Sequence, residues 1–376
     1  MKINVCHFTN IITGKSDGTY AHIRMIFKYL SKDKFQNFLV FQGNSDIEIE
    51  ARQLGIKVHV MKSLNKKFPV RCFKEFYSFV KSENIDIIHV HFLKPYSIAG
   101  LSNIFLRKKM IFNYHGLFID NLYNTKIDKL LYKRIHEIVN FFNVVDVAIV
   151  PSITSRQILL NETNKFKSIK TYYDGYDEII DEQIDSELIK FFLDLKKISF
   201  VVGIIARIDI QKRIDIALEI AKEITKIRND VCLVILGDGA LEKEIAKKIE
   251  VMNLNQNVKM MGYIPNAKLY IKYFDLLLYT SDWEGLPLSV WEAMAAKVPI
   301  VSTDVGGVKE ILEKEKCGLT YPKRNVEQGV KTILELLSDE KKREVMGEKG
   351  YNAIKQKYNS KAFADFFNNL YLSLSS

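Results

Sequence analysis

The feature that most constrains the fold is a regular alternation of short apolar runs with longer amphipathic ones. Strands that alternate with helices predict parallel sheets built from strand–helix–strand units. The expected strands are residues 3–8, 37–41, 57–61, 86–92, 110–115 and 146–151, then 200–206, 231–237, 258–262, 276–280 and 300–303. So many strands fit two doubly wound α/β domains better than one.

The chain has 376 residues, which is enough for about two domains. We place the boundary after Asp174 and Gly175, because Asp-Gly marks a turn and the polar segment 177–197 lacks a strand pattern. The expected domains are residues 1–178 and 179–358, followed by an aromatic-rich amphipathic helix within 359–376.

Positive charge gathers in the first domain. The net charge is +10, and residues 1–178 contain 26 basic and 16 acidic side chains, whereas the remainder contains 29 of each. Such asymmetry predicts that the first domain faces an anionic partner, such as a membrane, a nucleic acid or a phosphorylated substrate. The alternative is that the lysines merely reflect the base composition of the genome.

The basic residues are densest between Lys62 and Lys81, where five aromatic residues interleave with them, and residues 107–109 add to the patch. A basic amphipathic helix of this kind can lie on an anionic bilayer. Equally, its aromatic side chains can face the sheet while its lysines face water. The sequence contains no recognised nucleic-acid-binding motif, so nucleic acid is not an expected partner.

Three observations bear on location. The chain enters a predicted strand directly after Met1, which argues against a signal peptide, and no uncharged apolar run approaches the roughly 18 residues that span a bilayer. Cys6, Cys72, Cys232 and Cys317 form no closely spaced pair and read as reduced thiols. We therefore expect a cytoplasmic protein, held peripherally at the inner face of the cell membrane if the basic segment binds lipid.

The strongest chemical signal follows the predicted strand 276–280. A helix is expected to begin near Pro287, because proline is favoured in a first helical turn. Free N–H groups at residues 285–289 would then form an anion site, with Glu284 before it and Glu292 inside the helix. Carboxylates accept hydrogen bonds from hydroxyl groups, so this arrangement suits a sugar nucleotide. The alternative is an ordinary helix start with a solvated glutamate.

A second cluster supplies positive charge. Arg207 follows the strand 200–206, and Lys212 lies five residues later. A guanidinium and an ammonium group at the end of a strand suit a diphosphate and could neutralise it without a metal. Gly237 and Gly239 form a further turn after a strand, which is a weak signal because many strand–helix turns have this form.

With these residues the chain resembles the retaining GT-B glycosyltransferases of family 4, the "glycosyl transferases group 1" domain. Glu284 and Glu292 match the family's pair of glutamates separated by seven residues, and Arg207 and Lys212 match its phosphate-binding pair. Residues 292–307 and 173–177 are also similar, although Asp174 stands where the family usually has Asn.

The resemblance implies two Rossmann-like domains facing across a cleft, with the last helix crossing back to the first domain. It implies catalytic roles for His115, Glu284, Arg207 and Lys212. Glu284 would bind hydroxyls of the transferred sugar, and Glu292 would hold the ribose. The remaining donor-binding positions are Gly285, Leu286, Pro287, Leu288, Gly237, Tyr263, Ile264, Gly18 and Thr19.

Five residues of the first domain form three further candidate features. His115 stands at a strand end before a glycine, where the family often places a histidine beside the donor sugar. Gly18 and Thr19 are expected to form the turn that meets the diphosphate or the acceptor, although the family's adjacent glycines are missing there. His89 and His91 alternate on a strand and share one face; a metal pair is one interpretation, and hydrogen-bonded residues near the cleft are the one we favour.

The resemblance implies transfer of a hexosyl group from a nucleotide diphosphate sugar, with UDP favoured over GDP, to a hydroxyl of a glycan or lipid-linked acceptor in bacterial surface polysaccharide synthesis. Neither a metal nor another cofactor is expected. The alternatives are a GT-B sugar-nucleotide epimerase or glycoside phosphorylase and a non-catalytic glycosyltransferase-like subunit. A dinucleotide-dependent oxidoreductase would need a GxGxxG turn after the first strand, which Gly14 and Gly18 do not supply.

Overall fold

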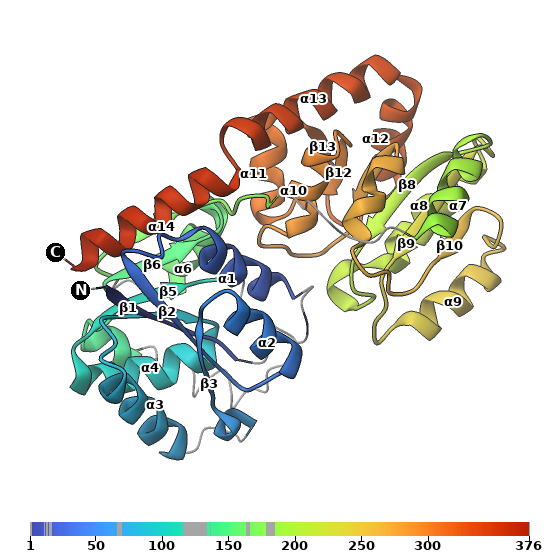
Figure 1. The fold of residues 1–376 in the computed structure, drawn as a ribbon. Helices are drawn as coiled ribbons and strands as arrows, with labels where there is room; N and C mark the ends of the chain where they lie inside the picture. Colours follow the sequence, from blue (N-terminus) through green and yellow to red (C-terminus); the bar gives the residue numbers. More distant parts are fainter. Residues whose placement is uncertain are drawn as a thin grey trace. The chain divides into compact units, whose positions relative to one another are not determined.

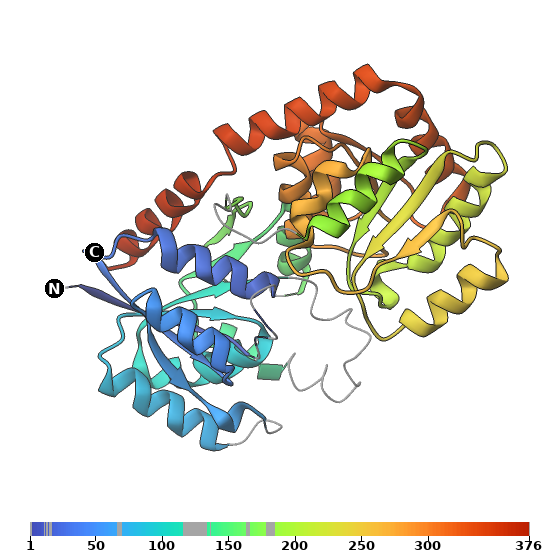
Figure 2. The ribbon, with the colours of Figure 1, turned by 45° about the vertical axis from the view of Figure 1, so that its right-hand side comes forward.

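The computed structural model describes residues 2–10, 12, 14, 17–65, 70–115, 134–135, 137–162, 166–177 and 185–375. The chain divides into two compact units, Met1–Asp174 with Ser360–Ser376, and Gly175–Asn359. Each unit is built on one parallel sheet flanked by helices (Figures 1 and 2). The predicted α/β class, with two doubly wound domains, is confirmed.

The N-terminal unit contains a seven-stranded sheet in the order β3-β2-β1-β4-β5-β6-β7, and every pair in it is parallel. Its strands are β1 (Ile3–Phe8), β2 (Phe35–Phe41), β3 (Lys57–Val60), β4 (Ile87–His91), β5 (Lys109–Asn113), β6 (Val147–Val150) and β7 (Ile169–Thr171). The order reverses beside β1, between β1 and β4, which is the switch point where open sheets of this type bind ligands beyond the strand ends.

Helices cover both faces of this sheet. They are α1 (Gly18–Tyr29), α2 (Ser45–Gln53), α3 (Val70–Ser82), α4 (Leu93–Leu106), α6 (Ile153–Glu162) and α14 (Ser360–Ser375), with a 3₁₀ turn η1 (Lys62–Asn65). Successive strand residues point to opposite faces. Cys6 of β1 therefore packs in the cluster of α3 and α4, whereas the preceding Val5 packs with α1 and α14.

The last helix of the chain belongs to the N-terminal unit. Phe363, Phe367 and Tyr371 on one side of α14 are fully buried and pack in the same cluster as Val5 and Ile87 of the sheet. Side chains three to four residues apart lie on one helix face, so the aromatic periodicity of the sequence predicted this buried stripe.

The C-terminal unit contains a six-stranded parallel sheet in the order β10-β9-β8-β11-β12-β13. The strands are β8 (Phe200–Ile205), β9 (Val231–Leu236), β10 (Val258–Met260), β11 (Leu276–Tyr279), β12 (Ile300–Thr303) and β13 (Gly318–Tyr321). Every residue of β9 is buried, which explains its unbroken apolar run.

The helices of this unit are α7 (Ser186–Lys196), α8 (Ile214–Thr225), α9 (Glu242–Val251), α10 (Leu288–Ala295), α11 (Gly306–Glu315), α12 (Val326–Ser338) and α13 (Glu340–Gln356). Two 3₁₀ turns, η2 (Ile210–Lys212) and η3 (Ala267–Tyr273), complete it. Apolar side chains of α8 and α12, among them Ile220 and Ile333, pack on β8 and β9 in one core.

The sequence missed two strands, β7 and β13. β7 is three residues long and contains an exposed lysine, and β13 begins with Gly318 and is half-buried except at Tyr321. Both strands lie at the edge of their sheets, where apolar patterning weakens because one side lacks a neighbouring strand. All four cysteines are buried and free, and none of the described helices is both long and apolar enough to cross a bilayer.

The two units meet along the chain between Asp174 and Gly175 and again between Asn359 and Ser360, close to the expected limits at 178/179 and 358/359. Residues 178–184 lie outside the described part of the chain. The basic segment between Lys62 and Lys81 is described except for residues 66–69. In α3, Phe76 and Phe79 face the core while Lys74 and Lys81 are exposed, so these two aromatic residues serve the fold.

We expect Phe367→Ala to destabilise the N-terminal unit by about 3–5 kcal/mol, because it removes a fully buried aromatic side chain and leaves a cavity. Urea unfolding monitored by far-ultraviolet circular dichroism measures the loss of unfolding free energy. Asn369→Ala, at an exposed position of the same helix, is the matched control and should change the unfolding free energy by less than about 0.5 kcal/mol. Equal stability of the two variants would contradict the placement of α14 in this core.

Candidate donor site

The loop between β11 and α10 carries Glu284 and leads into a helix N-terminus. Pro287 occupies the N-cap position, with φ −66°, and no side chain caps the helix that begins at Leu288. The first N–H groups of α10 are therefore not taken by a capping side chain, as the sequence predicted for an anion site. Pro287 itself lies one position before the helix rather than inside its first turn.

Glu284 forms a buried ion pair with Lys212. Lys212 Nζ lies 2.6 Å from Glu284 Oε1, and the two side chains are 14% and 5% exposed. Ser281 Oγ donates to the same carboxylate oxygen at 2.6 Å, and Gln211 Nε2 lies 3.4 Å from Oε2. The loop after β8 and the loop after β11 are thus joined through one carboxylate, whose Oε2 is less heavily engaged than its Oε1.

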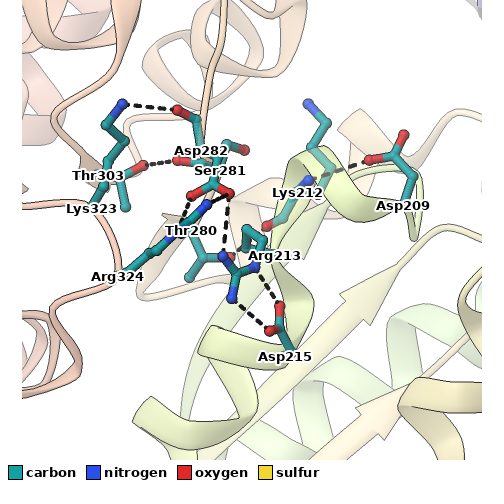
Figure 3. A network of polar contacts seen from close by, with 10 residues as sticks. All are labelled: Asp209, Lys212, Arg213, Asp215, Thr280, Ser281, Asp282, Thr303, Lys323 and Arg324. Carbon is teal, nitrogen blue, oxygen red and sulfur yellow. Dashed lines mark hydrogen bonds and ion pairs between the residues drawn. The ribbon is translucent and has the colours of Figure 1, made fainter. Parts of the chain in front are cut away.

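Arg207 and Lys212 lie on the same short loop and both contact Asp209. The Asp209 side chain is almost fully buried, and its Oδ1 accepts from the Lys212 backbone N–H at 3.2 Å (Figure 3). Arg207 Nη2 lies 3.2 Å from the other oxygen, Oδ2, while the Arg207 side chain is 76% exposed. The structure therefore places the two predicted phosphate ligands on one loop, Arg207 with an exposed side chain and Lys212 with a more enclosed one.

Glycines let the neighbouring strand ends approach closely. Gly237 has φ +144°, and a Cβ there would lie 1.9 Å from the Ala206 carbonyl oxygen. The Gly237 N–H donates to the Gly262 carbonyl at 2.7 Å, so the ends of β8, β9 and β10 meet backbone to backbone. Tyr263 follows Gly262 with an exposed ring, and Ile264 is half-buried. A side chain at position 237 would fill this approach.

Glu292 is half-buried on α10, about one turn after the start of the helix. Burial raises the pKa of Tyr279 well above its usual value, and the negative charges of Glu284 and Glu292 add to the rise. The Tyr279 hydroxyl lies 2.7 Å from Ser289 Oγ. Both glutamates therefore lie near one tyrosine, which places the carboxylate pair around the start of α10, where Gly285, Leu286 and Leu288 are half-buried.

In the N-terminal unit, His115 lies two residues beyond β5. Its Nε2 is 2.9 Å from His91 Nδ1 and 2.9 Å from the side-chain amide nitrogen of Asn113. Burial, and then the charge of His22, lower the pKa of His115 to about 3, so its imidazole is neutral at pH 7. A neutral ring can donate one hydrogen bond and accept another.

Two family models match the chain in succession. The Glycosyltransferase Family 4 model matches residues 16–177, and the Glycosyl transferases group 1 model matches residues 185–353. The chain belongs to the group 1 glycosyltransferases of family 4. The fold is therefore GT-B, and the family confirms the resemblance read from the sequence.

Two bacterial proteins are among the curated relatives of this glycosyltransferase. It is 33% identical over 46% of the chain to the poly(ribitol-phosphate) alpha-N-acetylglucosaminyltransferase of Staphylococcus aureus, but this match covers 35% of that protein. It is 25% identical to the N-acetyl-alpha-D-glucosaminyl L-malate synthase of Bacillus anthracis, over 77% of the chain and 75% of that protein.

A solved structure shares the fold over the whole chain. The crystal structure of Anabaena Alr3699/HepE in complex with UDP superposes with a TM-score of 0.79, at 17% identity, and covers 99% of this chain and 100% of that one.

The position of Gly18 and Thr19 in this glycosyltransferase differs from the expected turn. Both residues belong to the first turn of α1. The Asp17 side chain caps that helix and accepts from the N–H groups of Thr19 at 2.9 Å and Tyr20 at 3.2 Å. Because a carboxylate already occupies these donors, the start of α1 is less suited to a phosphate than the uncapped start of α10. Residues 15 and 16 lie outside the described part.

The sequence did not predict that several histidines of the N-terminal unit lie close to one another. His91 Nε2 lies 3.3 Å from His7 Nδ1, and His89 Nδ1 lies 2.7 Å from the Tyr371 hydroxyl. The favoured interpretation of His89 and His91, as hydrogen-bonded residues, agrees with these contacts. His7 stands opposite His89 in the pairing of β1 with β4, so the strand register was the signal that linked them.

Asp174, which replaces the usual Asn of the family, has a buried partner. Its Oδ1 lies 2.8 Å from His22 Nδ1 on α1. Burial alone would raise the pKa of Asp174, but the charge and hydrogen bond of His22 outweigh it and hold that pKa below its usual value. The aspartate that replaces the usual asparagine thus pairs with His22, which lies 152 residues away in the sequence. The sequence alone did not indicate this pairing.

We expect Lys212→Ala to destabilise the protein by about 3–5 kcal/mol, because it leaves the buried Glu284 carboxylate without its cation. Arg207→Ala removes a mostly exposed side chain that pairs with Asp209, and an ion pair open to solvent in this way should cost no more than about 1 kcal/mol of unfolding free energy. Chemical denaturation of the two variants side by side tests the contrast. Indistinguishable unfolding free energies would show that the Lys212–Glu284 pair is not formed as described.

Proposed function

We propose that this protein is a retaining glycosyltransferase that moves a hexosyl group from a nucleotide diphosphate sugar to a hydroxyl of a glycan or lipid-linked acceptor. The observation that carries the proposal is the Lys212–Glu284 pair beside Arg207 at the uncapped start of α10. A cationic group lies against a carboxylate that can accept hydrogen bonds from hydroxyl groups, and helix N–H groups that no side chain caps lie close to that carboxylate in the chain. The name of the Staphylococcus aureus relative, a poly(ribitol-phosphate) glycosyltransferase, supports bacterial surface polysaccharide synthesis as the setting.

The cations would stabilise the leaving group. As the bond between the anomeric carbon and the phosphate oxygen breaks, negative charge develops on the diphosphate. Arg207, which is exposed, and Lys212, which is held by Glu284 and Asp209, are placed to meet that charge. We propose that these two groups make a metal unnecessary. Undiminished turnover in the presence of a strong chelator would support this part of the proposal, and loss of turnover would contradict it.

The glutamates would bind the two sugars of the donor. Glu284 Oε2 is less engaged than Oε1 and can accept from a hydroxyl of the transferred hexose, while Glu292 would accept from the ribose hydroxyls. Gly237, Tyr263 and Ile264, at the ends of β9 and β10, would lie near the base. UDP is the favoured nucleotide, which the UDP complex of the Anabaena protein supports.

Retention would proceed on one face of the sugar. A double displacement needs a carboxylate nucleophile, and both carboxylates of the proposed site are assigned to hydroxyl groups. In the same-face route, the bond from the anomeric carbon to phosphate breaks, the acceptor oxygen bonds to that carbon from the same side, and the acceptor proton passes to the departing phosphate oxygen. His115, which is neutral at pH 7, would hydrogen-bond the donor sugar.

We predict that Arg207→Ala lowers kcat/KM by about 10²–10³-fold, corresponding to about 2.7–4 kcal/mol of transition-state stabilisation lost with one charged donor. Since the Arg207 side chain is largely exposed, this loss should come with at most a small loss of stability. A thermal-shift screen of UDP- and GDP-sugars first identifies the donor, because a ligand that binds the folded state raises the melting temperature. Turnover is then measured by mass analysis of the product with candidate acceptors.

Arg156→Ala, at an exposed position of α6 in the N-terminal unit, is the control and should retain normal turnover. Near-normal rates for Arg207→Ala would refute the donor-site assignment. Transfer without acceptor, giving an altered nucleotide sugar, would instead indicate the epimerase alternative. The anomeric configuration of the product, read by NMR, tests retention.

We also propose that the exposed basic residues of α3 hold the protein against an anionic membrane. Each Lys or Arg near such a surface contributes about 1 kcal/mol. The double change Lys74→Glu and Lys81→Glu should abolish co-sedimentation with anionic phospholipid vesicles in low salt, whereas Lys243→Glu, exposed on α9, should not. Binding to neutral and anionic vesicles alike, or none in the unaltered protein, would contradict this role.

A further inference from the structure

One carboxylate, that of Asp282, joins three loops of the C-terminal unit. Arg324 donates to it through Nε at 2.9 Å and through Nη2 at 2.6 Å, and Arg213 donates through Nη1 at 3.2 Å (Figure 3). These arginines come from the loop before α12 and the loop before α8, while Asp282 lies on the loop before α10. Hydrogen bonding to Arg324 lowers the pKa of Asp282, burial opposes this, and Arg213 lowers it further.

The main chain of Asp282 takes part in the same junction. Its N–H donates to the Gln211 carbonyl at 2.9 Å, and its carbonyl accepts from Lys323 Nζ at 3.2 Å. Asp282 therefore contacts the residue before Lys212 through its backbone and the residue after Lys212 through its side chain. Both of its carboxylate oxygens are engaged by guanidinium groups, which leaves it poorly placed to bind a donor itself.

Arg213 has a backbone conformation that needs support. Its φ of +49° and ψ of 48° lie in the left-handed region, which is unfavourable for a residue with a side chain. The guanidinium is fixed by Asp215, at 2.9 and 2.8 Å, and by Asp282. The sharp turn at Arg213 directs the Lys212 carbonyl to Thr280 Oγ1, at 2.7 Å, while Lys212 Nζ reaches Glu284.

We propose that Asp282 is a positioning residue of the donor site, which holds the turn at Arg213 so that Lys212 meets Glu284 and the diphosphate. This inference rests on the proposed function, because it assumes that Lys212 binds the donor. Asp282 acts through Arg213 and Lys212 and does not touch the donor. Displacement of a binding group by about 1 Å can lower turnover by about 10²-fold. The ion pairs around Asp282 would therefore affect turnover by holding Lys212 in position, although they do not contact the donor.

The test compares Asp282→Asn with Asp230→Asn. Asp230 forms a similar two-bond pair with Arg228, at 2.6 and 2.6 Å, at the opposite end of β9. We expect Asp282→Asn to lower kcat/KM by about 10²-fold and to weaken UDP binding by about tenfold in titration calorimetry, whereas Asp230→Asn changes neither. Normal kinetics and UDP affinity in Asp282→Asn would overturn the proposal.

A double variant separates positioning from general destabilisation. If Asp282 acts through Lys212, then adding Asp282→Asn to Lys212→Ala should weaken UDP binding no further. A further tenfold loss in that background would show that Asp282 acts elsewhere and would overturn the proposal. If Asp282→Asn does not fold, Arg324→Ala takes its place, because it truncates a side chain that is 64% exposed. This variant removes one of the two arginine partners of Asp282, so we expect UDP binding to weaken, but by less than in Asp282→Asn. Unchanged UDP binding in Arg324→Ala would likewise count against the proposal.

The proposed function and this inference fail in different ways. If the unaltered protein binds no nucleotide sugar or UDP, or if Lys212→Ala binds UDP normally, the donor site itself is wrong. If Lys212→Ala loses UDP binding while Asp282→Asn keeps it, the donor site stands and only the role of Asp282 fails.

Discussion

The loops that carry the proposed donor site are held by two carboxylates with little access to water, those of Asp282 and Glu284. A buried charge is tolerated only when it is paired and hydrogen-bonded. Glu284 meets Lys212 and Ser281, and Asp282 meets Arg213 and Arg324. Because these partners come from separate loops, satisfying the two charges fixes the loops relative to one another within the C-terminal unit.

Glycine backbones complete that arrangement where side chains would prevent it. Gly306, with φ +45°, allows the start of α11 to lie against the Glu284 carbonyl, where a Cβ would come within 1.9 Å. The Gly307 N–H then donates to the Gly285 carbonyl at 2.8 Å. The two neighbouring strand–helix loops thus hold each other in place through main-chain contacts. Packing, as well as ligand binding, therefore accounts for glycines in the segment 284–307 that carries the family resemblance.

Much of the fold was readable from the sequence, because strands buried on both faces leave unbroken apolar runs such as β9. The strands at the sheet edges, β7 and β13, were missed since their burial is incomplete. The candidate donor residues were proposed from motifs at the predicted strand ends and from the resemblance to a known family, but their pairing was not foreseen. Lys212 and Glu284 are 72 residues apart, and only the order of β8 beside β11 brings them together. The proximity of the histidines near His115 likewise depends on strand register. The turn expected at Gly18 is not formed, because the Asp17 side chain caps a helix that begins at Gly18.

The final helix, α14, has a consequence for how the protein is made. Its residues Phe363, Phe367 and Tyr371 complete the core of a unit whose sheet is formed by the first part of the chain. Synthesis runs from the N-terminus, so β1 to β7 leave the ribosome long before the helix that covers one of their faces. The C-terminal unit, whose residues 175–359 are contiguous, has all of its sequence available earlier than the N-terminal unit does. The unit whose synthesis begins first is therefore the unit whose core is completed last.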